Sequence, residues 1–208
     1  LSVYFSFAPD ETEHLHFKGG ALGDATFSLS VVGEGWQEPP ADLRAAIPLH
    51  IAHEAAHLWN LHLGSGERAG AWMHEGNANV LAWLALRETG YLSEDEFSTL
   101  VCAAESACLN QLGSSTLASQ ETAGASSVSY DCGAVVAHAT DRAMRASGNG
   151  DLFDFTNALI ARLDSRPGTN RHYFDQLYAM TGTNLVAQHD NNFAVRADDL
   201  AALQTCSD

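Results

Sequence analysis

The sequence predicts an α+β fold that is mostly α-helical, with a small N-terminal β-sheet followed by a helical bundle. Residues 1–35 are rich in β-branched and aromatic side chains and are broken by glycines. From about residue 41 the chain becomes helical in character, with capping residues and glycine stops. We therefore expect a β-rich subdomain over residues 1–40 and a helical subdomain over residues 41–208, forming one compact unit.

Strand patterns are clearest near the N-terminus. Residues 3–7 and 25–32 each combine valine, phenylalanine, serine or threonine in short runs, and Gly19-Gly20 separates the two. Residues 35–42 contain Pro39-Pro40 and are expected to form a loop. The chain begins at Leu1 without an initiator methionine, which suggests a processed protein or a piece of a longer one.

Helices are expected over the remainder of the chain. Proline suits a first helical turn, so the first helix has an alternative start near Pro48. Ser93 and Glu96 form a capping-box pattern for the third helix. Residues 113–129 are rich in Ser, Thr and Ala, which predicts a long loop near the site or a mobile cover. The expected helices span residues 43–62, 70–89, 94–112, 131–147, 151–164, 170–181 and 198–205.

The charge of the chain limits its partners. The formal net charge is −16, and Lys and Arg together number 10, which argues against binding nucleic acid or an anionic membrane surface. No apolar run approaches 18 residues, so no membrane span is expected. An acidic chain of this kind favours solubility and cationic substrates.

The chain has four cysteines: Cys102, Cys108, Cys132 and Cys206. None forms a CxxC pair, so a cysteine-based zinc site is not expected, while an even count permits two disulfides. An intact helix could not join Cys102 to Cys108, which face different sides. These features favour a secreted or periplasmic protein, with a cytoplasmic one as the alternative, and they leave the pairing open.

The most informative motif is His53-Glu54-Ala55-Ala56-His57, which has the form HExxH. Positions four apart on a helix differ by about 40°, so the two imidazoles project from one side. Imidazole nitrogens suit Zn²⁺, and Glu54 is placed to take a proton from a water on the metal. Chance matches also occur in a chain with ten histidines, so the motif needs support from elsewhere.

A hydrolytic zinc site needs a third protein ligand and one position open to water. Glu75 lies on the second expected helix, after a loop that lets the chain turn back toward His53 and His57. His74 is the alternative third ligand and would give a three-histidine site. Without a metal, Glu75 would be an ordinary carboxylate near a helix start.

The segment from His53 to Gly76 resembles the gluzincin metallopeptidases, in particular the aminopeptidase N and leukotriene A hydrolase family and the glycyl aminopeptidase family. The resemblance rests on HExxH followed by Trp-x-x-Glu-Gly at residues 72–76 and on the Trp59-Asn60 pair. The spacing between His57 and Glu75 is one residue shorter than in the aminopeptidase N pattern.

This resemblance implies a thermolysin-like zincin catalytic domain that holds one zinc ion. His53, His57 and Glu75 would be its ligands, and Glu54 would be the catalytic base. Residues 129–136 are similar to the family segment Tyr-x-Lys-Gly-Ala, so Tyr130 would donate to the oxyanion of the transition state. Cys132 stands where the family has lysine.

One family feature is missing. Gly23 occupies the place of the glutamate that binds the substrate's free amine, and Asp24 would point to the other face of the strand. The strand backbone could still pair with an extended peptide. His138, two turns after Tyr130, is a further candidate for a substrate contact.

The expected function is therefore a zinc-dependent peptidase acting on a peptide or protein through a metal-activated water. The alternative is a catalytically impaired, zinc-stabilised peptide-binding module of peptidase ancestry. The sequence leaves open whether the enzyme is an aminopeptidase or an endopeptidase, its side-chain preference and its oligomeric state.

Overall fold

The structure, a computed structural model, describes most of the 208-residue chain. The described residues are 2–8, 16–23, 26–33, 36, 38–60, 63, 70–164, 166–185, 195–203 and 206. The chain divides into two compact units, Leu1–Trp59 and Asn60–Asp208. The first unit contains the strands together with most of the first long helix, whereas the sequence-based division groups that helix with the others.

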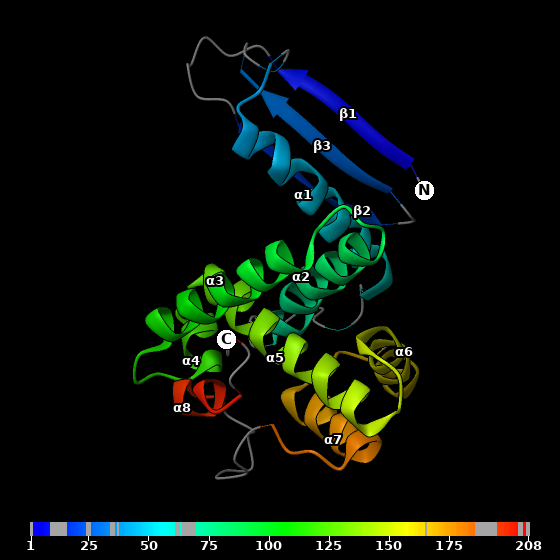
Figure 1. The fold of residues 1–208 in the computed structure, drawn as a ribbon, viewed down its shortest axis with the longest axis vertical. Helices are drawn as coiled ribbons and strands as arrows, with labels where there is room; N and C mark the ends of the chain where they lie inside the picture. Colours follow the sequence, from blue (N-terminus) through cyan, green and yellow to red (C-terminus); the bar gives the residue numbers. More distant parts are fainter. Residues whose placement is uncertain are drawn as a thin grey trace. The chain divides into compact units, whose positions relative to one another are not determined.

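A three-stranded sheet forms the first part of unit Leu1–Trp59. Its strands are β1 (Ser2–Ala8), β2 (His16–Gly23) and β3 (Thr26–Val32), in the order β1-β3-β2. β3 is central and pairs parallel to β1 and antiparallel to β2 (Figure 1). The strands predicted at residues 3–7 and 25–32 are confirmed as β1 and β3, and the β-rich N-terminal segment and the mostly helical α+β class are confirmed with them.

The helix α1 (Ala41–Asn60) carries the HExxH motif. It begins before Pro48, which lies inside it, so the alternative start near Pro48 is wrong. The carbonyl of Pro40 accepts from the amide of Arg44 at 3.0 Å, which starts the helix directly after the proline pair. Pro48 has no N–H to donate to Arg44, so the helix loses one backbone hydrogen bond without ending there.

Seven helices are described in unit Asn60–Asp208. The long helix α5 (Ser126–Ser147) packs against α2 (Ala71–Glu88) and α3 (Glu94–Leu112) (Figure 1). The capping box at Ser93 is confirmed, since its hydroxyl accepts from the Glu96 amide at 3.2 Å. The remaining helices are α4 (Leu117–Thr122), α6 (Leu152–Leu163), α7 (Asn170–Thr181) and α8 (Ala197–Ala201).

The long loop predicted over residues 113–129 is wrong. The structure places α4 and the first turn of α5 in this stretch. Thr116 caps α4 by accepting from the Ser119 amide at 3.2 Å, and Leu117 buries all but 1% of its surface. The composition is ambiguous because serine and threonine occur in both loops and helix caps, and this short helix is held by its two buried residues, Leu117 and Glu121.

Two glycines let α2 and α5 approach closely. A Cβ built on Gly76 would overlap the backbone of Gly133, and one built on Gly133 would overlap the carbonyl oxygen of Trp72. Backbone thus meets backbone at this crossing, where no side chain would fit. The crossing sets which residues of α2 face which residues of α5. Gly76 is one position from Glu75, and Gly133 is three positions from Tyr130.

We expect Gly133→Ala to lower the free energy of unfolding by about 1–3 kcal/mol, because the added methyl must push the two helices apart. Chemical denaturation measures the change. Ala146→Val, at an exposed position of α5, is the control and is expected to cost about 0.6 kcal/mol, the loss in helix propensity. A Gly133→Ala loss no larger than that of the control would contradict the close approach.

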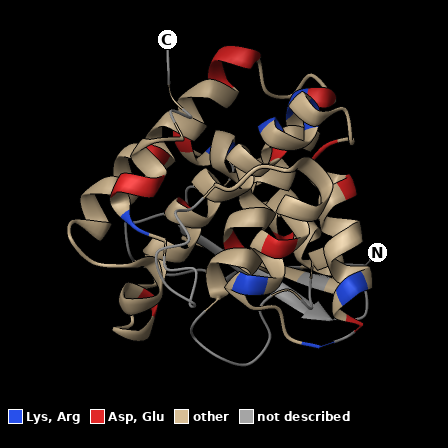
Figure 2. Cartoon of the chain, turned by 90° about the horizontal axis from the view of Figure 1, so that it is seen from below, with Lys and Arg blue, Asp and Glu red and all other residues tan. Residues whose placement is uncertain are grey.

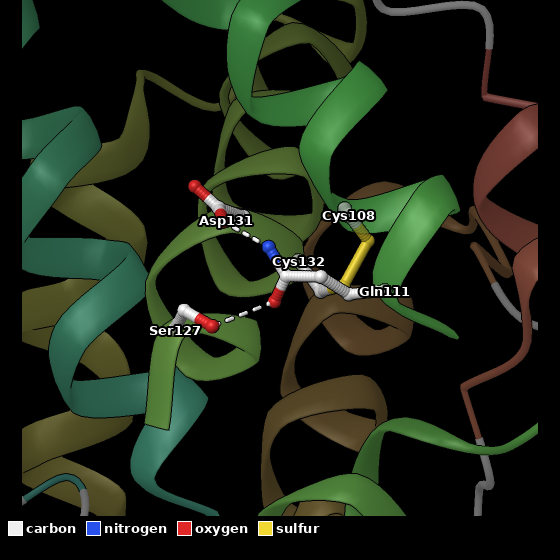
Figure 3. Close-up of a disulfide and its surroundings, with 5 residues drawn as sticks. All are labelled: Cys108, Gln111, Ser127, Asp131 and Cys132. Carbon is white, nitrogen blue, oxygen red and sulfur yellow. Dashed lines mark hydrogen bonds between the residues drawn. A yellow bond between two sulfur atoms is a disulfide. The ribbon is translucent and has the colours of Figure 1, made fainter. Parts of the chain in front are cut away.

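Two disulfides cross-link this unit, as the even cysteine count permitted. Cys102 pairs with Cys206, and Cys108 on α3 pairs with Cys132 on α5. Beside the second bond, Gln111 donates to Asp131 at 2.6 Å and accepts from Ser127 at 2.9 Å (Figure 3). Cys132 therefore has a structural role at the position where the gluzincin segment has lysine.

Acidic residues outnumber basic residues in this chain. Figure 2 shows acidic residues scattered over them with few basic residues between, in line with the net charge of −16. In the part of the chain that the structure describes, no helix has both the length and the apolar character needed to cross a membrane.

Candidate metal centre

The pitch of α1 brings the two motif histidines together. His53 and His57 lie one turn apart, and their ring centroids are 4.4 Å apart. Their exposed fractions are 7% and 6%, so both imidazoles are buried polar groups. Neutral imidazole nitrogens are common metal ligands, so two of them on one side of a helix suit a shared metal ion.

Glu54 follows His53 and is also buried, with 7% of its surface exposed. Its Oε1 lies 3.8 Å from Nδ1 of His50. Its Oε2 is buried and makes no hydrogen bond to any described residue. A buried carboxylate oxygen without a donor is costly, so this atom fits a site where a polar group from outside the chain is received.

His50 shares this environment. Burial lowers its pKa below the usual value, against the opposing effect of Glu54, and His53 and His57 lower it further. The lowered pKa favours the neutral imidazole of His50 at pH 7.

Glu75 on α2 completes a group of three. His53, His57 and Glu75 each offer one ligand atom, and these atoms lie within 4.8 Å of one another. Within the described ranges, the group that meets this criterion contains Glu75 and not His74. Two imidazole nitrogens and a carboxylate oxygen are a donor set that Zn²⁺ accepts, and they leave a fourth tetrahedral position open. These residues fit a metal ion.

Glu75 also lines a cavity of about 330 Å³ together with Tyr130. Tyr130 lies near the start of α5 and is 38% exposed. A phenol and a carboxylate are thus brought to one cavity by the crossing of α2 and α5. The other lining residues are small or polar: Ala71, Glu121, Gly124, Ala125, Ser126 and Ser129.

Sequence reasoning missed Glu121, which lies in α4 and is 5% exposed. Its Oε2 accepts from the amide of Gly70 at 2.9 Å, and its Oε1 accepts from the amide of Trp72 at 2.8 Å. Gly70 is the N-cap of α2 and has no side chain to cap it, so Glu121 supplies the cap from elsewhere in the chain. Its charge also suits the positive end of the α2 dipole.

The same carboxylate holds the start of α5. The hydroxyl of Ser129 donates to Oε1 of Glu121 at 2.8 Å. Ser129 precedes Tyr130, and Glu75 lies one turn beyond the amides that Glu121 binds. One buried side chain therefore fixes the separation of the two helix starts that carry Glu75 and Tyr130. No local pattern around Glu121 signals this role.

Asn60 is a second residue whose role only the structure gives. It ends α1, is fully buried, and donates from Nδ2 to the carbonyl of His74 at 2.8 Å. The Trp59-Asn60 pair noted in the sequence thus includes an amide that ties the end of the HExxH helix to the residue before Glu75.

Two further expectations have different outcomes. His138 does not line the cavity of Glu75 and Tyr130; it lines another one. Gly23 ends the edge strand β2, and Asp24 lies outside the described residues, so the expectation for its side chain stays a prediction.

The fold and site together define a mostly helical protein with a candidate metal centre of two histidines and a glutamate. No family model matches the chain, and no curated protein or solved structure matches it.

Proposed function

We propose that the protein is a zinc-dependent peptidase of the gluzincin type. The observation that carries this proposal is the group of His53, His57 and Glu75 on two helices, with the buried and unpaired Oε2 of Glu54 beside it. A thermolysin-like catalytic arrangement, with one zinc ion, is part of the proposal.

Each residue has a role in the proposed reaction. His53, His57 and Glu75 would hold the zinc ion, which when bound would act as a Lewis acid on a carbonyl and would lower the pKa of a water. Glu54 accepts a proton from the attacking water and passes it to the leaving amine. Tyr130 donates a hydrogen bond to the oxyanion that forms on the scissile carbonyl.

The proposal is tested with quenched peptides that carry free or blocked N-termini, assayed with and without a chelator. Chelator-sensitive cleavage of blocked peptides identifies an endopeptidase, and cleavage of free peptides alone identifies an aminopeptidase. Metal analysis of the purified chain is expected to give one zinc per molecule. Zinc without any cleavage would favour the peptide-binding module, for which Gly23 in place of an amine-binding glutamate is the supporting observation.

Tyr130→Phe is expected to lower kcat by about 10²-fold or more while leaving KM nearly unchanged, because the lost hydrogen bond forms in the transition state. Steady-state kinetics on a cleaved peptide measure both constants. Tyr178→Phe, an exposed tyrosine on α7, is the control and should keep wild-type values. An unchanged kcat for Tyr130→Phe would remove the oxyanion role.

We also propose that the protein works in an oxidising compartment outside the cytoplasm. Two disulfides per chain form and persist where thiols are not kept reduced. By the chain-entropy relation, closing loops of 104 and 24 residues stabilises the fold by about 4.7 and 3.5 kcal/mol respectively.

A further inference from the structure

A second cavity, of about 570 Å³, lies among α2, α3 and α5 and shares no lining residue with the cavity of Glu75 and Tyr130. Arg87, Arg142 and Arg145 line it. The whole chain has ten basic residues and a net charge of −16, so three arginines at one cavity are a strong local enrichment. The proposed peptidase mechanism uses none of them.

Arg87 is held at the wall of this cavity by an aromatic ring. Its guanidinium carbon lies 4.3 Å from the centre of the Phe97 ring, and Phe97 is buried. Its Nη1 also lies 3.3 Å from Oε1 of Glu94, but the Glu94 side chain is 71% exposed. An ion pair this exposed contributes little to stability, and Glu94 lines the same cavity, so Arg87 is held mainly by the Phe97 ring.

Arg145 is fixed by a buried acid. Its Nε donates to Oδ2 of Asp141 at 2.8 Å, while Oδ1 of Asp141 accepts from the Leu152 amide at 3.0 Å. The hydrogen bond to Asp141 raises the pKa of Arg145. Nη2 of Arg145 also lies 3.6 Å from Oδ2 of Asp151. A guanidinium carries five N–H donors, so the two carboxylates orient the fork without using all of its donors.

His138 supplies a polar atom without a partner. Its ring centroid lies 5.6 Å from that of Phe97, and its Nδ1 is buried with no hydrogen bond to any residue that the structure describes. Burial lowers the pKa of His138 to about 4, with Asp141 and Glu105 acting to raise it and Arg142 and Arg87 to lower it. The imidazole is therefore neutral at pH 7 and can hydrogen-bond a ligand.

We propose that this cavity binds a small ligand through an oxyanion, namely a phosphate, sulfate or carboxylate group, held by Arg87, Arg142 and Arg145. The cavity lining gathers three arginines and two carboxylates, Glu94 and Asp141, and Asp151 lies just outside the lining with its Oδ2 3.6 Å from Nη2 of Arg145. Guanidinium forks match the geometry of such oxyanions. The volume lies in the range of small-molecule sites. The site is independent of the peptidase proposal.

The test uses the full chain with its disulfides intact and titrates it with inorganic phosphate and with citrate by calorimetry. We expect saturable binding at a single site that weakens as ionic strength rises. The tighter of the two probes identifies whether phosphate or carboxylate is the preferred group.

Arg142→Gln is the decisive variant, since Arg142 is exposed and its Nη1 donates to the carbonyl of Leu203 only at a long 3.5 Å, so its loss should leave the fold intact. We expect it to weaken binding about tenfold, the loss of one charge-assisted contact. Arg162→Gln on α6 removes the same charge from an exposed arginine outside the cavity and should bind as the wild type does. In NMR titrations, saturating phosphate should raise the pKa of His138 from about 4.

Two results would overturn the proposal. The first is a wild-type chain that binds neither probe below about 10 mM. The second is equal weakening of binding in Arg142→Gln and Arg162→Gln, which would mean that anion affinity depends on the net charge of the chain and not on this cavity. Thermal unfolding of both variants confirms that a loss of binding is not a loss of fold.

Discussion

Glu54→Gln is expected to bind zinc as tightly as the wild type and to lose about 10²–10⁴-fold in kcat. The amide keeps the size of the carboxylate but cannot take a proton from water. Because Glu54 lies next to the ligands and is not one of them in the proposed site, the metal should remain. Zinc content after gel filtration and kcat on a cleaved peptide are the two measurements.

The control for this variant is Asp42→Asn, which removes a carboxylate from the exposed first turn of the same helix. It should leave both zinc content and kcat unchanged. If Glu54→Gln retained wild-type turnover, another group would have to act as the base. If it lost zinc, Glu54 would be a ligand and the proposed set of three would be wrong.

Glu121→Ala is expected to lower the free energy of unfolding by about 4 kcal/mol. The change removes a buried acceptor of three hydrogen bonds, and bonds to a charged group contribute about 1.5–3 kcal/mol each without adding fully. The amides of Gly70 and Trp72 would be left buried without an acceptor. Chemical denaturation followed by tryptophan fluorescence measures the loss, since Trp72 is buried beside the affected helix start.

One further variant measures the contribution of the hydrogen bond from Glu121 to α5, and another serves as a control for an exposed capping carboxylate. Ser129→Ala removes the hydrogen bond to α5 alone and should cost about 1 kcal/mol. Glu96→Gln alters an exposed capping box on α3 and should cost far less than Glu121→Ala. Equal losses of unfolding free energy for the Glu96 and Glu121 variants would mean that a buried capping carboxylate stabilises the fold no more than an exposed one.

Much of the helical part of the fold could be predicted because its signals are local. The capping box at Ser93 acts within one turn, and α2 and α3 lie within a residue or two of their predicted bounds. The loop predicted over residues 113–129 is wrong because α4 is stabilised by burial of Leu117 and Glu121 against other segments of the chain. Composition alone carries no such information.

The candidate site divides in the same way. His53, Glu54 and His57 can be grouped from the sequence, since their spacing and the helical pitch are enough. Choosing Glu75 over His74 from residues alone depended on an assumed turn of the chain. Glu121 could not be found, and Asn60 could be noted only as part of a motif without its role, because each acts through backbone groups of another segment.

The sequence by itself determined the helical pitch of the HExxH motif, the acidity of the chain and an even number of cysteines, since each of these is a property of neighbouring residues or of a count. The tertiary structure alone decided the pairing of Cys108 with Cys132, the crossing at Gly76 and Gly133, and the gathering of three arginines at one cavity. These features depend on which helix faces meet, and that is set by packing over the whole unit.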